Sequence, residues 1–248
     1  EKNYINGKQQ GLWTIFFDST GIKKEETFYK DGVQQGIWTE WYSDGQKKRE
    51  RNFSNGERDS TWTTWYENGN KKLRATYSNG KLNGLYTSWY DGGIIKEQEG
   101  EYLENKKHDK WTHWSNKGQK IEEVNYNNGI HNGDHIRWFD DKNHQHKIFH
   151  VSYNNGKKNG PWNYWYNNGL DSIQSYYKDG VKDGKWIWWR KNGDKDKEGE
   201  YKNELKHGIW TVWNDSTGKA YHKLHRETFV EGKINGQVTK WYKEGKLD

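Results

Sequence analysis

The stretch YNNGKKNGPWNYWYNNG, from Tyr153 to Gly169, decides how this sequence folds. Two Trp and two Tyr lie within five consecutive residues, and an Asn-Gly pair bounds them on each side. Asn-Gly is the strongest short signal for a tight hairpin turn, because both residues tolerate a positive φ. The stretch therefore predicts a strand between two turns. Its aromatic residues could form a binding site, a core or one copy of a repeat.

The same pattern recurs along the chain. Ten copies can be counted, spaced by 24 to 28 residues, and each begins at an aromatic residue that we number position 0. The copies start at Tyr4, Tyr29, Phe53, Tyr77, Tyr102, Tyr126, Tyr153, Tyr177, Tyr201 and Phe229. A short fixed period is typical of repeat arrays, in which each unit is stabilised by its neighbours. We therefore expect a single repeat domain over residues 1–248.

Aromatic residues occupy fixed positions in the repeat. Position 12 is aromatic in all ten copies, and position 9 is Trp in seven. Of the 17 tryptophans, only Trp188 falls outside these two positions. We interpret the others as structural aromatic columns: Trp13, Trp38, Trp41, Trp62, Trp65, Trp89, Trp111, Trp114, Trp138, Trp162, Trp165, Trp186, Trp189, Trp210, Trp213 and Trp241.

Glycine recurs in the same way, at position 3, position 7 and position 16 or 17, which together hold 25 of the 28 glycines. Each copy then reads as turn, strand, turn, strand. Two strands in about 24 residues leave no room for a crossover helix, so neighbouring strands must be antiparallel. The predicted fold is all-β, an elongated single meandering antiparallel sheet of about ten repeated β-hairpins. We expect altered turns or local surfaces in the copies that depart from the pattern. Asn105 and Glu204 replace Gly at position 3, Ser60 and Asp109 replace it at position 7, and His135 and Val238 replace the position-9 Trp.

The segments between the Trp-bearing strands are charged, as in QKKRERNF from Gln46 to Phe53. Aliphatic stems of Lys and Arg that lie over aromatic rings bury apolar area and add cation–π attraction. We therefore expect a core of rings and long charged side chains. Positions 9 and 12 differ in parity, so strict alternation places rings on both faces of the sheet, whereas a bulge would bring them together.

Composition restricts the function. The net charge is +6, from 41 basic and 35 acidic residues, which is milder than the basic stripe of a nucleic-acid binder, so we expect no nucleic-acid partner. There is no Cys, which excludes disulfides and cysteine chemistry, and no stretch of about 20 apolar residues.

There is also no Met, so we expect a removed leader or a missing segment before Glu1. These facts fit a bacterial cell envelope or secreted protein, and a trimmed cytoplasmic protein fits them equally.

With the unit Y-x-N-G-x-x-x-G-x-W-x-x-W-Y-x-N-G laid out, the chain resembles the MORN repeat (membrane occupation and recognition nexus) from Tyr4 to Gly245. It is most similar to the bacterial variant often labelled as a toxin–antitoxin antitoxin. The resemblance implies strings of β-hairpins that serve as non-enzymatic scaffolds, and membrane-lipid binding is proposed for some members. The antitoxin label implies stoichiometric binding of another protein.

Departures from the repeat are where a partner is most plausibly bound. Two lengthened copies carry histidines, in DDKNHQHKIFH (Asp140–His150) and GKAYHKLHRETF (Gly218–Phe229). His144 and His146, two residues apart in the first segment, could bind a metal, but a polar insertion loop is the simpler interpretation. We expect neither a metal nor a cofactor. The candidate partner-binding residues are Tyr164, Trp188, His144, His146, His150, His222, His225 and Arg226.

No phosphate loop, dinucleotide fingerprint or nucleophile elbow is present, so we expect no enzymatic activity. The favoured function is a scaffold for protein–protein interaction, because regular sheets rich in Tyr, Trp and Arg offer interface hot spots, and we expect the scaffold to be a subunit of a larger assembly. Edge strands invite pairing, and we expect it at Glu1–Gly21 or Phe229–Asp248. Two alternatives stay open: binding of anionic membrane lipid, and binding of carbohydrate, which requires a column of exposed Trp rings.

Overall fold

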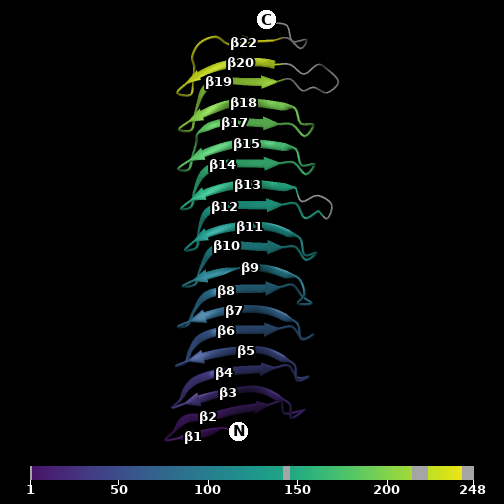
Figure 1. Cartoon of the computed structure of the whole chain (residues 1–248), viewed down its shortest axis with the longest axis vertical. Helices are drawn as coiled ribbons and strands as arrows, with labels where there is room; N and C mark the ends of the chain where they lie inside the picture. The colour runs from purple at the N-terminus through teal and green to yellow at the C-terminus, as the bar shows by residue number, and fades with distance from the viewer. Residues whose placement is uncertain (1, 142–145, 214–222, 242–248) are drawn as a thin grey trace. The chain divides into compact units, whose positions relative to one another are not determined.

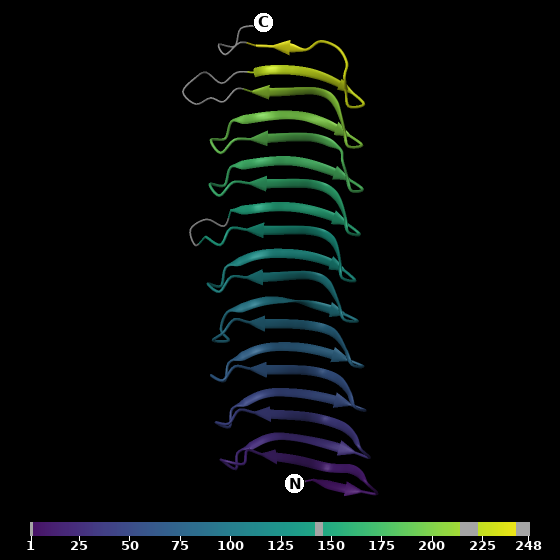
Figure 2. The ribbon, with the colours of Figure 1, turned by 180° about the vertical axis from the view of Figure 1, so that it is seen from behind.

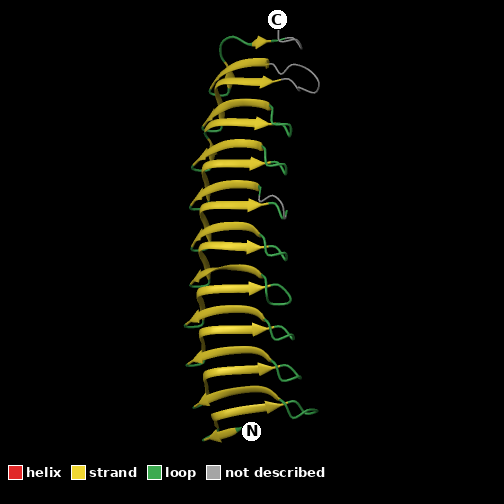
Figure 3. Ribbon diagram, turned by 45° about the vertical axis from the view of Figure 1, so that its right-hand side comes forward, coloured by secondary structure: helices red, strands yellow, loops and turns green. Residues whose placement is uncertain are grey.

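The computed structural model describes residues 2–141, 146–213 and 223–241, and within these residues it contains strands, turns and loops but no helix (Figures 1 and 3). The expected all-β fold, a meandering antiparallel sheet of consecutive hairpins, is confirmed. No helix long and apolar enough to cross a membrane occurs in these ranges. The chain divides into two compact units, residues 1–120 with 126–129 and residues 121–125 with 130–248.

In unit 1 each strand pairs antiparallel with the next strand of the chain. Its strands are β1 (Asn3–Ile5), β2 (Lys8–Phe16), β3 (Lys23–Lys30), β4 (Val33–Trp41), β5 (Lys47–Ser54), β6 (Glu57–Trp65), β7 (Lys71–Ser78), β8 (Lys81–Trp89), β9 (Lys96–Leu103) and β10 (Lys106–Trp114). The residues of β11 (Lys120–Asn127) are shared between the two units.

Unit 2 repeats this arrangement, and Figure 2 shows its hairpins from behind. Its strands are β12 (Ile130–Trp138), β13 (Lys147–Asn154), β14 (Lys157–Trp165), β15 (Asp171–Lys178), β16 (Val181–Lys182), β17 (Gly184–Trp189), β18 (Lys195–Lys202), β19 (Leu205–Trp213), β20 (Lys223–Val230), β21 (Lys233–Ile234) and β22 (Thr239–Lys240). Two pairs of short strands, β16 with β17 and β21 with β22, stand where other hairpins have one strand.

A two-residue turn at positions 2 and 3 joins the strands of each hairpin, and both residues have a positive φ, as in a type I′ turn. The expectation of altered turns at Asn105 and Glu204 is wrong, because their φ values are 66° and 69°. Their side chains compensate with hydrogen bonds to the preceding hairpin. Leu82 N donates to Asn105 Oδ1 at 2.8 Å, and Lys182 N donates to Glu204 Oε1 at 2.7 Å.

Successive turns are also joined by backbone hydrogen bonds. The N–H at position 3 donates to the carbonyl at position 5 of the preceding hairpin, for example from Gly80 to Arg58 at 2.8 Å and from Gly180 to Lys158 at 2.8 Å. At the opposite edge, where loops join one hairpin to the next, the Tyr66 hydroxyl donates to the Trp89 carbonyl at 2.7 Å. Tyr42, Tyr90 and Tyr166 make the equivalent bond. Both edges therefore tie neighbouring hairpins together within a unit.

The glycine at position 7 marks a β-bulge inside a strand. Gly160 lies within β14 with φ of 93°, and the pairing of β14 with β13 shifts register between Val151 and Tyr153. At this position Ser60 and Asp109 also keep a positive φ, of 57° and 51°, so the bulge survives the loss of Gly. The bulge places the position-9 Trp over its partner strand, which positions the core described next.

Candidate protein-binding surface

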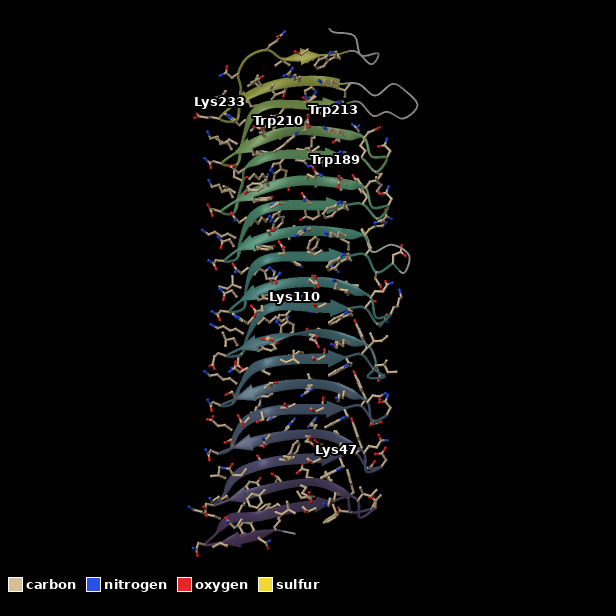
Figure 4. The ribbon with its side chains drawn as sticks, in the orientation of Figure 1. Lys47, Lys110, Trp189, Trp210, Trp213 and Lys233 are labelled. Atoms are coloured by element: carbon tan, nitrogen blue, oxygen red, sulfur yellow. The ribbon has the colours of Figure 1, made fainter. Side chains whose placement is uncertain are left out.

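The two tryptophans of a strand point to opposite faces of the sheet. Trp162 and Trp165 are three residues apart in β14, and side chains alternate along a strand. The same spacing separates Trp210 and Trp213 of β19, which Figure 4 labels in mid-strand and near the loop edge. We call the face that bears the position-9 tryptophans face 1 and the other face 2. The position-7 bulge does not bring both rings to one face, because it precedes position 9. The later register shift between Tyr164 and Trp165 skips Ser172 of β15, so β14 itself keeps its alternation.

The face 1 tryptophans are buried although a single sheet carries them. The exposed fraction is 8% for Trp62, 0% for Trp111 and 7% for Trp162. Each indole N–H donates to a backbone carbonyl ten residues earlier, at 3.0 Å for Trp62, 3.0 Å for Trp111 and 2.9 Å for Trp162. The bulge interrupts the regular ladder at that carbonyl, so the indole supplies the missing donor.

Lysine ammonium groups cover these rings, as the sequence predicted. Lys107 Nζ lies 4.0 Å from the centroid of Trp111, and Lys158 Nζ lies 4.3 Å from that of Trp162. In unit 1 the Arg51 guanidinium lies 4.7 Å from both Trp38 and Trp62, and burial lowers its pKa. A ring with a cation on one side and the sheet on the other offers no open platform for stacking on a sugar.

Face 2 has the same kind of packing at position 12. Lys47, labelled at the loop edge in Figure 4, lies 5.9 Å from the centroid of Trp65. In unit 2, Lys147 lies 5.7 Å from Trp165, and Lys195 lies 5.5 Å from Trp213. The buried tryptophans lie mainly at position 9, whereas the position-12 tryptophans, apart from Trp213, are half-buried. The assignment of both sets as structural columns stays a prediction.

An apolar row crosses four neighbouring strands on face 1 of unit 2. Phe149 of β13 lies opposite Tyr164 of β14, Tyr164 opposite Ile173 of β15, and Ile173 opposite Trp188 of β17. Residues directly opposite each other in an antiparallel pair share a face. All four are half-buried, so each keeps part of its side chain in contact with solvent. We call Phe149, Tyr164, Ile173 and Trp188 the apolar row.

Rings hold the apolar row in place. The Trp188 ring lies 5.4 Å from that of Trp186 and has Lys197 Nζ at 4.7 Å. The rings of Phe149 and Tyr164 are 5.9 Å apart, and burial raises the pKa of Tyr164. The row continues through Lys197 to Val212 on the next two strands. Contacts with neighbouring rings and with Lys197 therefore restrain Phe149, Tyr164 and Trp188.

The equivalent row of unit 1 is mostly polar, although the surrounding Trp columns are the same. Pairing from β2 to β10 places these residues on it: Ile15, Glu25, Glu40, Arg49, Thr64, Leu73, Ser88, Gln98 and His113. The repeat itself therefore does not require large apolar side chains at these positions. Their concentration in unit 2 is a local property of this chain, which is typical of an interaction surface.

Lysines border the apolar row on the side of the hairpin turns. Along β14, Lys158, Trp162 and Tyr164 follow one another on face 1, and Lys182 and Lys206 repeat the position of Lys158 in the next hairpins. Lys182 has Glu204 at 4.0 Å. In the ranges that the structure describes, Lys158, Lys197 and Lys206 contact rings and form no ion pair. Face 1 of unit 2 thus combines an apolar row with three lysines that no carboxylate of the described residues neutralises.

The structure brings some of the sequence candidates together and separates others. Tyr164 and Trp188 share the apolar row, and His225 lies on the same face opposite Val212. His150 and Arg226 lie on face 2, and His146 packs against Gly169 at the loop edge. His144 and His222 lie outside the described residues. A role for any of these residues in partner binding stays a prediction.

Sequence reasoning missed Phe149 and Ile173, which complete the row. An alignment of the ten repeat copies could have revealed both residues, because some positions that vary between copies become apolar in the second half of the chain. His135, noted as a departure from the position-9 Trp, adds to this end of the row, since its ring lies 4.8 Å from Phe149 and its Nε2 lies 2.8 Å from Glu122 Oε1. Among the described side chains no group of three or more His, Asp or Glu could hold a metal ion.

Face 2 of unit 2 has an open hollow of about 550 Å³ that includes Arg226. Carboxylates of Glu198 and Glu200 line it together with Lys185, Lys223 and Arg226, so charges of both signs face the hollow. Such a mixture favours no particular class of ligand.

Three segments of the chain match the family model described as MORN repeat variant: residues 34–55, 58–79 and 182–203. The first two fall in unit 1 and the third in unit 2. These matches support the assignment of the repeats to the MORN type, whose members generally mediate interactions with proteins or membrane lipids. They do not extend to the antitoxin label or to a bacterial origin. No curated protein matches the chain.

Proposed function

We propose that this chain is a non-enzymatic β-repeat scaffold that binds another protein through face 1 of unit 2. The observation that carries the proposal is the apolar row, because four large apolar side chains stand half-buried on the surface where unit 1 has mainly polar residues. Tyr and Trp are the residues that most often dominate interface energetics, and a pre-ordered row loses little side-chain entropy on binding.

Membrane lipid is the second candidate, and the charge distribution favours it less. Adsorption to an anionic membrane needs a strong basic surface, at about 1 kcal/mol for each Lys or Arg near the membrane. The net charge is only +6, and many lysines lie over rings or beside carboxylates. Carbohydrate binding is less favoured still, because cations cover the indole rings.

A cluster on face 2 bears on the proposed lack of enzymatic activity. Ser152, Asp134 and His150 resemble the residue types of a hydrolase triad, but the Ser152 hydroxyl donates to Asp134 Oδ1 at 2.8 Å. His150 Nε2 lies 3.2 Å from the same oxygen atom. In a working triad the His accepts the proton of the nucleophilic Ser. In this arrangement the serine is bound to the carboxylate, which does not activate it.

The experiment that tests the proposal is isolation of the full chain from its own cells after mild crosslinking. We expect one protein at a fixed ratio, with crosslinks from Lys158, Lys182 or Lys206, which border the apolar row. Recovery of the chain alone, or with lipid or glycan only, would refute a stoichiometric protein partner. Pairing at the chain ends, which the sequence predicts, would give crosslinks within residues 1–21 or 229–248 instead.

A further inference from the structure

We infer that face 1 of unit 2 binds an amphipathic α-helix of a partner protein that has acidic residues along one side of its apolar stripe. The inference rests on the proposed scaffold function and adds the chemistry of the partner. Its evidence is the spacing of the apolar row and the position of the lysines beside it.

The spacing of the apolar row matches a helix better than an extended peptide. Row members stand on consecutive strands, and neighbouring strands are about 4.8 Å apart. An apolar stripe with residues three and four apart advances about 5.2 Å per contact at 1.5 Å per residue. Side chains on one face of an extended peptide are about 6.8 Å apart. The four members span roughly 14 Å, which about ten residues of helix would cover.

The lysines determine which flank of the bound helix should carry acidic residues. The ammonium group of Lys158 lies over Trp162, and that of Lys182 lies over Trp186. Trp162 stands two residues before Tyr164 on β14, and Trp186 stands two residues before Trp188 on β17. A helix is about 10–12 Å wide with its side chains, so one seated on the row has its turn-side flank above these cations. Acidic residues on that flank would meet Lys158, which forms no ion pair within the described residues.

The residues that unit 1 carries at the positions of the apolar row supply the variants for a test. Unit 1 carries Thr64 and Ser88 where unit 2 carries Tyr164 and Trp188. Tyr164→Thr with Trp188→Ser therefore introduces residues that this sheet already accommodates at those positions. Tyr176→Thr is the matched control, since Tyr176 is 42% exposed and lies opposite Pro161 on face 2.

The probe is a fluorescent synthetic helix of about 18 residues, with Leu at the a and d positions of each heptad and Glu on one flank. Fluorescence anisotropy measures its affinity for the full chain. We expect binding that weakens at least about tenfold in the row variant, is unchanged in Tyr176→Thr, and falls as salt is added. The same peptide with Lys in place of Glu, or with a central Pro that breaks the helix, should bind at least about tenfold more weakly.

Three results would overturn the inference: equal binding of the Glu and Lys peptides, equal binding of the Pro peptide, or no effect of the row variant. Vesicles containing phosphatidylserine serve as a second probe, and sedimentation with them that depends on the row, without peptide binding, would also overturn it. If no peptide binds while crosslinking in cells still recovers one protein, the partner chemistry is wrong and the scaffold function stands. If crosslinking recovers no protein, the scaffold function itself fails.

Discussion

Replacement of Gly100 by Ala tests how the buried tryptophans are held. A Cβ atom at Gly100 would lie 2.5 Å from Cε2 and Cγ of Trp111, whose side chain is 0% exposed. Gly100 does not have a positive φ, so the alanine adds no backbone strain. The overlap must therefore be relieved by movement of the indole, which packs 5.7 Å from Tyr86 and donates to the Glu101 carbonyl at 3.0 Å.

Overpacking of a closely packed site costs about 1–3 kcal/mol, and loss of the ring pair with Tyr86 adds about 0.5–1.5 kcal/mol. Alanine offsets about 0.4–1 kcal/mol by reducing the freedom of the unfolded chain. The free energy of unfolding should therefore fall by about 2 kcal/mol. In β13 and β14, Val151 lies opposite Trp162, so a position-9 indole can pack over a residue larger than Gly. We therefore expect the Trp111 indole to move and repack, and the loss of stability to stay below the cost of removing the whole ring.

Urea unfolding followed by far-UV circular dichroism measures the change, and a double-mutant cycle with Trp111→Leu isolates its cause. In the Trp111→Leu background the ring is absent, so Gly100→Ala should be neutral or stabilise by up to about 1 kcal/mol. An equal loss of stability in both backgrounds would refute the reasoning, because the cost would then not arise from the indole.

The remaining predictions concern the bulge, the loop edge and pH. Ser60→Gly should raise the free energy of unfolding by about 1 kcal/mol in urea titrations, because φ at Ser60 is 57°. Tyr66→Phe should lower it by about 0.5–1.5 kcal/mol, because the hydroxyl donates to the Trp89 carbonyl. Stability should fall as pH rises above about 10, because burial raises the pKa of Tyr86 and Tyr164, and the unfolded chain then loses protons first.

Each of these has a matched control. Gly36→Ser makes the reverse change at the equivalent bulge, where φ is 70°, and should destabilise; stabilisation by both variants would contradict the argument from φ. For the loop edge, Tyr29→Phe serves as the comparison, since Tyr29 contacts the Trp13 ring on face 1. In the alkaline titration, Tyr86→Phe should reduce the loss of stability between pH 9 and pH 11, and an unchanged loss would assign it to other groups.

The repeat made the fold predictable, since Trp and Gly at fixed positions identify hairpins, turns and core. The surface was harder to predict. Whether Phe149 and Tyr164 share a face depends on bulges that shift the register, as between Tyr164 and Trp165, and a shift of one residue moves a side chain to the other face. Sequence also did not separate His225 on face 1 from Arg226 on face 2 until strand bounds were known. Position 7 was interpreted as a turn because Gly serves both turns and bulges.

The hydrogen bonds between successive turns have a consequence for how such a chain changes in evolution. They join backbone atoms about one repeat apart, as from Gly80 N to Arg58 O, so they make few demands on the side chains of either hairpin. A duplicated or deleted segment of one repeat can therefore be joined to its neighbours without rebuilding the contacts on either side. Duplication of the segment that contains Tyr164 and Ile173 would lengthen the apolar row by two strands. The length of the apolar row, and with it the length of the partner helix that we propose for it, would then depend on gene duplication as much as on point substitution.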